Sequence, residues 1–369
     1  MGAVAVALVA CSTALLDDPA VDQADSLRAT VDAWRERTPV PGVVVGVAGP
    51  EVGEYLLASG TLQRDAGEPV AISTRFRVGS ITKLLVAGVV LQLVEGGSLT
   101  LADYVVDVAL GAAEPLRAAG LLDGVTVEDL LRHTSGLPDS ARSSELIDSL
   151  EADPAAIWTP DQVFALVSKS RREFDPGTSF GYSNTNFLLL GEVIEGVTGN
   201  PWWNETRTRI LDPLDMADSY LAGFESHAGP LAPGYFDLDN DGFTEELDPD
   251  WPALETTEGP AGTLVSTVPD LLRFGGSLFG GEVVSGESLK VMTSPGRFSS
   301  RYTGYGLGLE ISKPDLETTV WGHGGFVPGY RAVLWHAPEP EVTIVVLTNE
   351  SRSRPDGLAE LALRIAGRQ

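Results

Sequence analysis

The sequence has little cysteine, little lysine and few basic residues overall. Cys11 is the only cysteine, so no disulfide can form within one chain. Lysine and arginine number 25 against 52 aspartate and glutamate residues, and four of the 25 are lysine, so the net charge is −27. Such a chain repels phosphates, which excludes nucleic acid as an expected partner. The charge is compatible with an acid-adapted or salt-adapted extracellular surface.

Long apolar runs are also missing after the first residues. Beyond residue 22 no stretch of about 18 apolar residues occurs, so no membrane-spanning helix is expected there. Hydrophobic residues make up 43% of the chain and charged residues 21%, which is ordinary for a folded protein. These values predict one large globular protein, and no internal repeat is visible.

The first residues do contain an apolar run. Residues 3–10 are alanine, valine and leucine, and the run ends directly before Cys11. The segment 8–11 (Leu-Val-Ala-Cys) resembles a bacterial lipobox, in which the cysteine carries lipid. Residues 1–22 are therefore interpreted as a leader and linker, and the protein is expected outside the cytoplasm, secreted or anchored to the membrane through lipidated Cys11. The positive residues that usually begin a leader are missing, so a spurious signal or a start further upstream is the alternative.

The most informative pair of residues is Ser80 and Lys83, three positions apart at the start of an apolar, helix-like segment, residues 83–94. Positions i and i+3 share a helix face, so the lysine amine can reach the serine hydroxyl. Serine becomes a nucleophile when a neighbouring base takes its proton, and burial lowers the pKa of a lysine enough to make it such a base. Taken singly, Ser80 could instead be a helix N-cap.

Two further groups of polar residues and glycines stand far downstream. Tyr182 and Asn184 precede a helical pattern and point to the same side of an extended segment. His323, Gly324 and Gly325 lie between two strand-like runs, where glycines let a substrate approach the backbone and an N–H could stabilise an oxyanion. Singly, Asn184 could be a helix cap and His323 a core histidine.

In this order the three groups form the motifs S-x-x-K, Y-x-N and H-x-G. The sequence thereby resembles the serine β-lactamase and penicillin-binding superfamily, in particular the branch of class C β-lactamases, D-alanyl-D-alanine carboxypeptidases and related esterases. The resemblance covers roughly residues 25 to 367. Supporting stretches are residues 130–137, 174–177 and 262–267.

The resemblance implies a role for each residue. Ser80 is the acylated nucleophile, Lys83 its proton partner, and Tyr182 a base or proton shuttle whose pKa the Lys83 ammonium would lower. The division of the base role between Lys83 and Tyr182 stays open. Asn184 orients the substrate amide, and the backbone N–H groups of Ser80 and Gly325 form the oxyanion hole. No cofactor and no metal are implied.

The function implied is hydrolysis through an acyl-enzyme. We expect a D-alanyl-D-alanine carboxypeptidase-like peptidase or a related esterase, acting on a small molecule or a peptidoglycan-type peptide. The alternatives are a β-lactamase and a penicillin-binding sensor that acylates without turnover. His323 replaces the lysine of many relatives and is largely neutral at pH 7. A substrate carboxylate would therefore need another cation, for which Arg331 and Arg301 are candidates.

A rival nucleophile is Ser179, in a G-x-S-x-G pattern at residues 177–181. In α/β-hydrolases this serine follows a buried strand, and the H-G-G oxyanion segment precedes it. Here the segment before Ser179 is polar, and His323 comes after the serine, so this assignment is rejected. His133, in a turn-like run that ends at Gly136, is interpreted as structural.

An acidic stretch approximates a calcium-binding loop. Asp237, Asp239 and Asp241 occupy positions 1, 3 and 5, Gly242 follows at position 6, and Asp248 stands where a glutamate is usual. No strong helices flank the stretch, so an acidic hairpin turn is the favoured interpretation.

The fold class expected is α/β (α+β), of the β-lactamase and transpeptidase type. Strand-like runs at 43–47, 54–57, 330–335 and 342–347 predict an antiparallel sheet, flanked by helices over about 23–37 and 357–364. The resemblance implies that residues 23–369 form one hydrolase domain. Its α/β part would comprise about 23–83 and 265–369, with a mainly helical part at about 84–264 inserted. Capping boxes at Thr126 and Thr159 predict helix starts.

Overall fold

The computed structural model describes residues 19–64, 67–109, 111–226, 231–239, 241–248, 250–297, 304–313 and 318–367. The predictions made for the leader, for Cys11 and for Arg301 lie outside these residues. Within them, no helix is both long enough and apolar enough to span a membrane.

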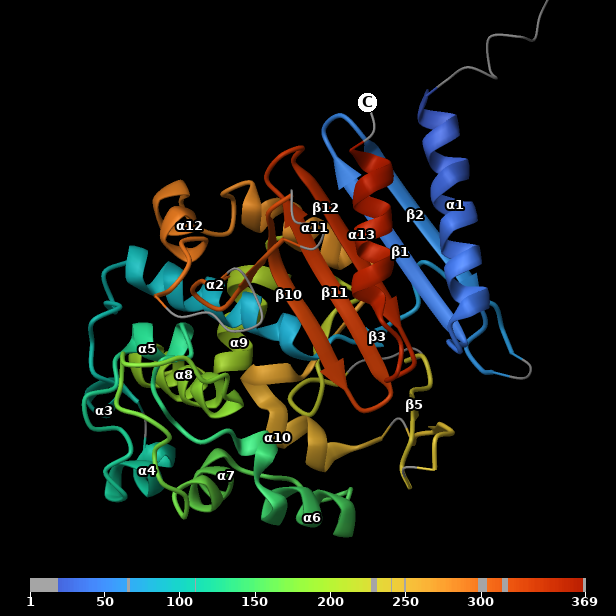
Figure 1. Ribbon diagram of the computed structural model, residues 1–369. Coiled ribbons are helices and arrows are strands. Elements are labelled where there is room, and N and C mark those ends of the chain that lie inside the picture. The colour runs from blue at the N-terminus through green and yellow to red at the C-terminus, as the bar shows by residue number, and fades with distance from the viewer. Residues whose placement is uncertain are drawn as a thin grey trace, which may run out of the picture.

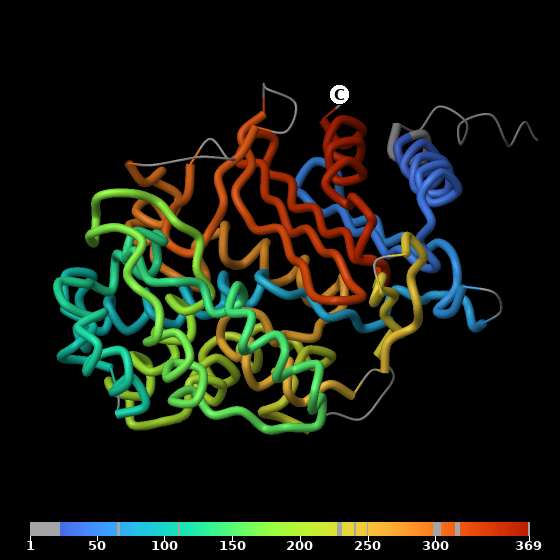
Figure 2. Tube along the Cα trace, turned by 60° about the horizontal axis from the view of Figure 1, so that its bottom comes forward, coloured from blue at the N-terminus to red at the C-terminus, as the bar shows by residue number. Residues whose placement is uncertain are grey.

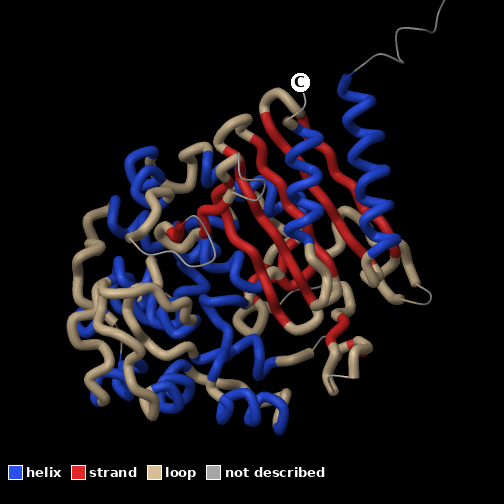
Figure 3. The backbone as a smooth tube through the Cα atoms, viewed as in Figure 1, coloured by secondary structure: helices blue, strands red, loops and turns tan. Residues whose placement is uncertain are grey.

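A seven-stranded antiparallel sheet forms the centre of the molecule (Figures 1 and 3). Its order is β2-β1-β12-β11-β10-β9-β8, so strands from the two ends of the chain pair in the middle, with Val45 opposite Val346. The predicted antiparallel sheet that joins N-terminal and C-terminal segments is confirmed. The strands are β1 (Gly42–Gly49), β2 (Gly53–Gly60), β8 (Gly304–Tyr305), β9 (Glu310–Ser312), β10 (Val320–Val327), β11 (Tyr330–Ala337) and β12 (Val342–Thr348).

Two helices cover one face of the sheet. Helices α1 (Pro19–Arg37) and α13 (Pro355–Ala366) lie in front of the sheet in Figure 1. Alternate side chains of β1, such as Val43 and Val45, join Val31 of α1 and Leu358 of α13 in one buried cluster. Period-two burial along a strand produces this arrangement, because successive side chains point to opposite faces.

Helix α11 (Val268–Phe279) covers the other face. A β-carbon at Gly46 of β1 would lie 2.4 Å from a methyl of Val268 and 2.6 Å from one of Leu272. Glycine is therefore required where the helix approaches the strand. Val44 and Leu347 point to this side and join the largest hydrophobic cluster.

Helices of the middle region form a second layer, which Figure 2 shows on the side of the molecule away from α1 and α13. Its central helix is α2 (Thr82–Glu95), in which nearly every residue is buried, as expected for a helix that is apolar all round. The other helices of this layer are α3 (Val105–Val108), α4 (Glu114–Ala118), α5 (Val127–Leu131), α6 (Ser144–Ala152), α7 (Pro160–Val167), α8 (Asn184–Thr198), α9 (Trp202–Thr206) and α10 (Pro252–Gly262), of which α8, α9 and α10 contact α2.

The predicted capping boxes are present, at Thr126 before α5 and at Thr159 before α7. The remaining elements are β3 (Phe76–Arg77), β4 (Tyr220–Leu221), β5 (Tyr235–Phe236), β6 (Glu245–Glu246), β7 (Leu264–Ser266), α12 (Gly286–Met292), the 3₁₀ turns η1 (Gly79–Ile81), η2 (Gly111–Ala113) and η3 (Ser140–Arg142), and the π-helical turn η4 (Arg207–Leu211).

One hydrophobic cluster contains residues of both predicted parts, for example Val44 and Val345 of the sheet with Leu130 and Phe187 of the helical layer. The two predicted parts thus share one hydrophobic core. Their division into an α/β part and an inserted helical part stays a prediction.

The acidic stretch forms a hairpin, as favoured. Strands β5 and β6 pair antiparallel, and Asp239 and Asp241 accept hydrogen bonds from backbone N–H groups two residues further on. The carboxylates of Asp237, Asp239 and Asp241 lie within 4.8 Å of one another. The Arg352 guanidinium forms an ion pair with one of them, with a nitrogen 3.7 Å from an oxygen of Asp237.

Candidate active site

Ser80 lies in the η1 turn that leads into α2. The caps of both η1 and α2 are formed by other residues, without a side-chain hydrogen bond, so the alternative of Ser80 as an N-cap is wrong. Gly79 has φ +51°, and a β-carbon there would lie 2.9 Å from the carbonyl oxygen of Phe326. Glycine thus lets the turn approach β10, which places Ser80 between a helix start and a strand.

The Lys83 ammonium lies fully buried beside the serine. Its Nζ donates to Ser80 Oγ at 3.1 Å, to Asn184 Oδ1 at 2.8 Å and to the Ala261 carbonyl at 2.7 Å. Burial lowers the pKa of Lys83 from 10.5 to about 8, although the carboxylates of Glu258, Asp139 and Glu310 act in the opposite direction. A fraction of the lysine is therefore neutral near pH 7 and able to accept a proton.

Tyr182 approaches Ser80 from the other side. Its hydroxyl donates to Ser80 Oγ at 2.9 Å, and its ring packs on His133 with 4.3 Å between centroids. Burial raises the Tyr182 pKa well above 10, and Glu310 and Asp139 raise it further. The expectation of a lowered pKa is wrong, because desolvation disfavours the phenolate and the surrounding carboxylates repel its charge. Tyr182 is a neutral phenol in this site.

Asn184 is the first residue of α8, and the cap before it is Ser183. The Asn184 side chain accepts from Lys83, while its backbone N–H donates to Asp139 Oδ1 at 2.9 Å. The alternative of Asn184 as a helix cap is therefore wrong. Residues separated by about a hundred positions, Ser80 and Lys83 on one side and Tyr182 and Asn184 on the other, come together as the motif order predicts.

His323 lies on β10 within a buried hydrogen-bonded chain that includes His133 and Tyr305. The Nδ1 atom of His133 lies within hydrogen-bond distance of the Ser183 N–H and of the Asn186 amide nitrogen. Both groups donate, so Nδ1 accepts and His133 carries its proton on Nε2, 3.2 Å from the Tyr305 hydroxyl.

The direction of the remaining bonds follows from that assignment. The Tyr305 hydroxyl accepts from His133 and donates to His323 Nε2 at 3.1 Å, and His323 Nδ1–H donates to the Gly324 carbonyl. Burial lowers the pKa of both histidines, that of His323 to about 3. His323 is neutral, as expected, and His133 holds the structural position predicted for it. Tyr305 was not singled out from the sequence, because no motif marks it.

Glu310 of β9 is a site residue that sequence reasoning missed. It is 8% exposed, its Oε2 accepts the Gly324 N–H at 3.1 Å, and its Oε1 lies 3.8 Å from His323 Nδ1. The carboxylate lines the same cleft as Ser80. A glutamate in a short strand carries no sequence signal for such a role, because the residues that it contacts in the site belong to another strand, β10.

The strand register bears on the oxyanion donor. Val327 and Tyr330 flank a two-residue hairpin loop, so these two residues form a hydrogen-bonded pair. Hydrogen-bonded and non-hydrogen-bonded pairs alternate along an antiparallel ladder, so Gly325 and Ala332 form the next hydrogen-bonded pair. The Gly325 N–H is therefore directed at β11. Phe326 has its N–H and carbonyl on the opposite side, and that carbonyl lies against Gly79. The register thus points to Phe326, instead of Gly325, as the partner of the Ser80 N–H.

A cleft of about 1180 Å³ opens above these residues. Arg331, Arg354 and Phe326 are among the residues that line it. Arg331 stacks on the Phe326 ring at 4.4 Å and donates from Nε to the Ser351 carbonyl at 2.8 Å. Of the two candidate cations for a substrate carboxylate, Arg331 is thus in the cleft. Ser179, the rival nucleophile, is half-buried in an irregular segment with no strand before it.

The fold and the serine–lysine–tyrosine arrangement define a serine hydrolase of the β-lactamase and transpeptidase type. The Beta-lactamase family model matches residues 27–368, and the chain belongs to this family.

Relatives in this family have several named activities. Penicillin-binding protein 4 of Amycolatopsis lactamdurans is 29% identical over 330 residues, which cover 86% of this chain and 83% of that protein. A D-aminopeptidase of Gluconobacter oxydans is 28% identical over 92% of this chain, which spans only 62% of that enzyme.

Solved structures have the same fold. A D-stereospecific amidohydrolase from Streptomyces sp. is similar with a TM-score of 0.78 and 28% identity, covering 92% of this chain and 98% of that one. A D-amino acid amidase from Ochrobactrum anthropi has a TM-score of 0.80 and 25% identity, covering 94% and 97%.

Proposed function

We propose that this protein hydrolyses D-aminoacyl amides and peptides, or small uncharged esters, through an acyl-enzyme on Ser80. The observation that carries the proposal is the position of Ser80 Oγ, which is 3.1 Å from the buried Lys83 amine and 2.9 Å from the Tyr182 hydroxyl. A hydroxyl between a base of lowered pKa and a neutral proton donor is suited to acyl transfer.

The first half-reaction uses both partners. Neutral Lys83, which at a pKa of about 8 is roughly one molecule in ten at pH 7, takes the Ser80 proton as Oγ attacks the carbonyl carbon. The N–H groups of Ser80 and Phe326 stabilise the oxyanion, where one such donor contributes about 3–4 kcal/mol. As the carbon–nitrogen or carbon–oxygen bond breaks, the Tyr182 phenol supplies the proton that the leaving group requires.

The second half-reaction releases the acid. Water attacks the Ser80 ester, loses one proton to the Lys83–Tyr182 pair, and the carbon–Oγ bond breaks as Ser80 regains its proton. Asn184 holds Lys83 from the far side, so the amine stays aimed at Oγ throughout.

Charge around the cleft supports the choice of substrate. Beside Ser80 stand a neutral His323, the glycines of β10 and the carboxylate of Glu310. A carboxylate near His323 attracts the free ammonium of a D-aminoacyl substrate and repels a substrate carboxylate. The D-aminopeptidase and amidase relatives favour the same class. A D-alanyl carboxypeptidase is the second candidate, favoured by Arg331 and Arg354 in the same cleft.

Mass spectrometry tests the acyl-enzyme. We expect an activated ester to give a transient adduct on Ser80 that decays with turnover, and Ser80→Ala to give neither adduct nor product, while Ser179→Ala retains both. An adduct with penicillin that persists, with no turnover of amides or esters, would identify the protein as a sensor and overturn the proposal.

The substrate class is tested at Glu310. Glu310→Gln keeps an acceptor for the Gly324 N–H and removes the charge. We expect kcat/KM for D-alaninamide to fall about tenfold or more, whereas kcat/KM for p-nitrophenyl acetate changes little. Glu360→Gln, which removes another carboxylate of the same cleft, is the matched control. If kcat/KM is higher for D-alanyl-D-alanine than for D-alaninamide, and Glu310→Gln raises kcat/KM for D-alanyl-D-alanine further, the carboxypeptidase assignment replaces ours.

A further inference from the structure

A second pocket lies in the helical layer, away from Ser80. It has a volume of about 370 Å³ and is bounded mainly by α7, α8, α9 and α10. None of its lining residues lines the Ser80 cleft. At about 30 Å³ for each water, the space holds roughly a dozen water-sized groups, which is enough for a small organic molecule.

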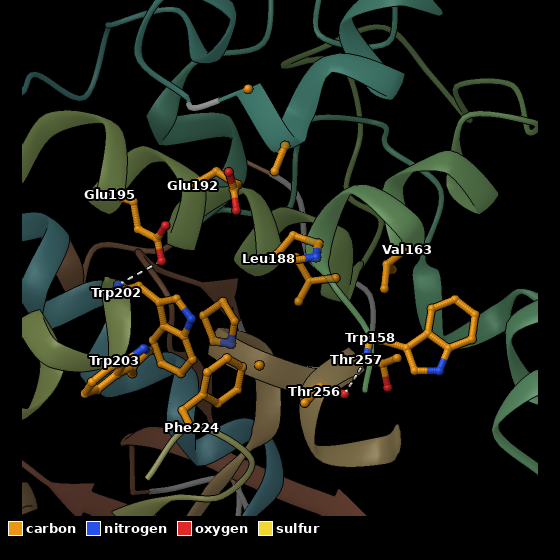
Figure 4. A pocket seen from close by; sticks show the side chains of 15 residues that line it. Trp158, Val163, Leu188, Glu192, Glu195, Trp202, Trp203, Phe224, Thr256 and Thr257 are labelled. Carbon is orange, nitrogen blue, oxygen red and sulfur yellow. Dashed lines mark hydrogen bonds between the residues drawn. The ribbon is translucent and has the colours of Figure 1, made fainter. Parts of the chain in front are cut away.

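Aromatic side chains make up much of its wall. Trp202, Trp203 and Phe224 line one side, and Trp158 lies on the other side beside Thr256 (Figure 4). The Trp202 and Phe224 rings meet edge to face, with centroids 5.1 Å apart and planes at 75°. Aromatic faces carry negative electrostatic potential, so a cage of this kind attracts organic cations.

Glu192 of α8 brings a charge into this apolar space. It is 4% exposed, and among the residues that the structure describes its carboxylate has no hydrogen-bond or ion-pair partner. In Figure 4 the carboxylate extends into the pocket, across from Trp202 and Phe224. The nearby Glu195 differs, because its Oε1 accepts the backbone N–H of Trp202 at 3.1 Å.

A carboxylate that is largely shielded from water and has no protein partner is costly, because its charge is only weakly compensated. Burial raises the pKa of Glu192 to about 7, and Glu195 and Asp161 add to the effect. The site therefore has an uncompensated negative potential. A metal ion would find too few oxygen ligands among aromatic rings, and a neutral apolar ligand would leave the carboxylate unpaired.

We propose that this pocket binds a small organic cation with an apolar body, a primary or quaternary alkylammonium, with its charge on Glu192 and its methyl or methylene groups against Trp202 and Phe224. This is a binding site separate from the acyl site at Ser80, and it does not depend on the function proposed there.

Isothermal titration calorimetry with choline tests the site, and 3,3-dimethylbutan-1-ol serves as its uncharged isostere. We expect choline to bind the wild type, and the alcohol to bind about tenfold more weakly or worse. Glu192→Gln has the same shape without the charge and should lose about tenfold or more in choline affinity. Glu151→Gln, at an exposed glutamate of α6, is the matched control and should bind like the wild type.

Two further binding measurements test where the site lies and which group carries its charge. Ser80→Ala should bind choline as the wild type does, and the affinity should rise as pH increases through about 7, because Glu192 must ionise while choline stays charged throughout. Equal affinity of Glu192→Gln and wild type, equal affinity for the alcohol and choline, or no binding by the wild type at tens of millimolar would each overturn the proposal.

Discussion

At the scale of single residues, Lys83 is subject to two opposing effects. Its three N–H donors have three acceptors, Ser80 Oγ, Asn184 Oδ1 and the Ala261 carbonyl, which suits an ammonium. Burial favours the neutral amine, and the balance brings the pKa to about 8. Because the Tyr182 pKa moves upward instead, the geometry supports Lys83 as the base of the free enzyme and Tyr182 as the proton donor.

A pH-rate profile tests this division. A base works when deprotonated, so a pKa lowered from 10.5 to about 8 makes kcat/KM for an uncharged activated ester rise with pH and level off above about 8. Lys83→Met should lose about 10²–10⁴ in rate and the pH dependence with it. Lys169→Met, at an exposed lysine paired with Glu145, is the control and should keep the profile. A rate that does not change between pH 6 and 9 in the wild type would assign the base role elsewhere.

At the scale of elements, the site depends on how closely β10 approaches η1. A β-carbon on Gly325 would lie 2.3 Å from the Val78 carbonyl oxygen, whereas one on Gly324 has no neighbour nearer than 3.8 Å, Glu310 Oε2. The two glycines are adjacent, yet only Gly325 is required by packing. This contact sets the distance between the Phe326 amide and Ser80.

The two glycines provide a matched pair of variants. We expect Gly325→Ala to lower the free energy of unfolding by about 1–3 kcal/mol and to lower kcat, because β10 must move away from Ser80. Gly324→Ala should change stability by no more than about 0.5 kcal/mol. Urea unfolding and ester hydrolysis measure the two effects. Equal stability losses in both variants would refute the close approach of β10 and η1.

At the scale of the whole molecule, charge is unevenly placed. The chain carries a net charge of −27, yet Arg331 and Arg354 face the cleft. The net charge of the molecule therefore repels anionic groups, whereas these two cations attract them locally within the cleft. Cys11 lies outside the described residues, and its lipid attachment remains a proposal that rests on the segment 8–11.

Fractionation of a bacterial host that expresses the full chain tests the anchor. We expect the wild type in the membrane fraction and Cys11→Ala in the soluble fraction, because an anchoring acyl chain contributes about 0.8 kcal/mol for each buried CH₂ group. Ser12→Ala, at the next residue, is the control and should stay with the membrane. Soluble wild-type protein would exclude the anchor.

Local features of this protein were readable in the sequence because they depend on residues a few positions apart. The spacing of Ser80 and Lys83, the capping boxes at Thr126 and Thr159 and the strand periodicities are of this kind. The order of three motifs then indicated the family.

The tertiary structure alone decided the properties that depend on distant segments. The Ala261 carbonyl reaches Lys83 across 178 positions, and burial sends the pKa of Tyr182 in the direction opposite to the one expected. The register of β10 against β11 directs the Phe326 amide to the open side, and β9 brings Glu310 to the site. Desolvation, strand register and the partners of a buried charge are set by packing, which no local pattern of residues encodes.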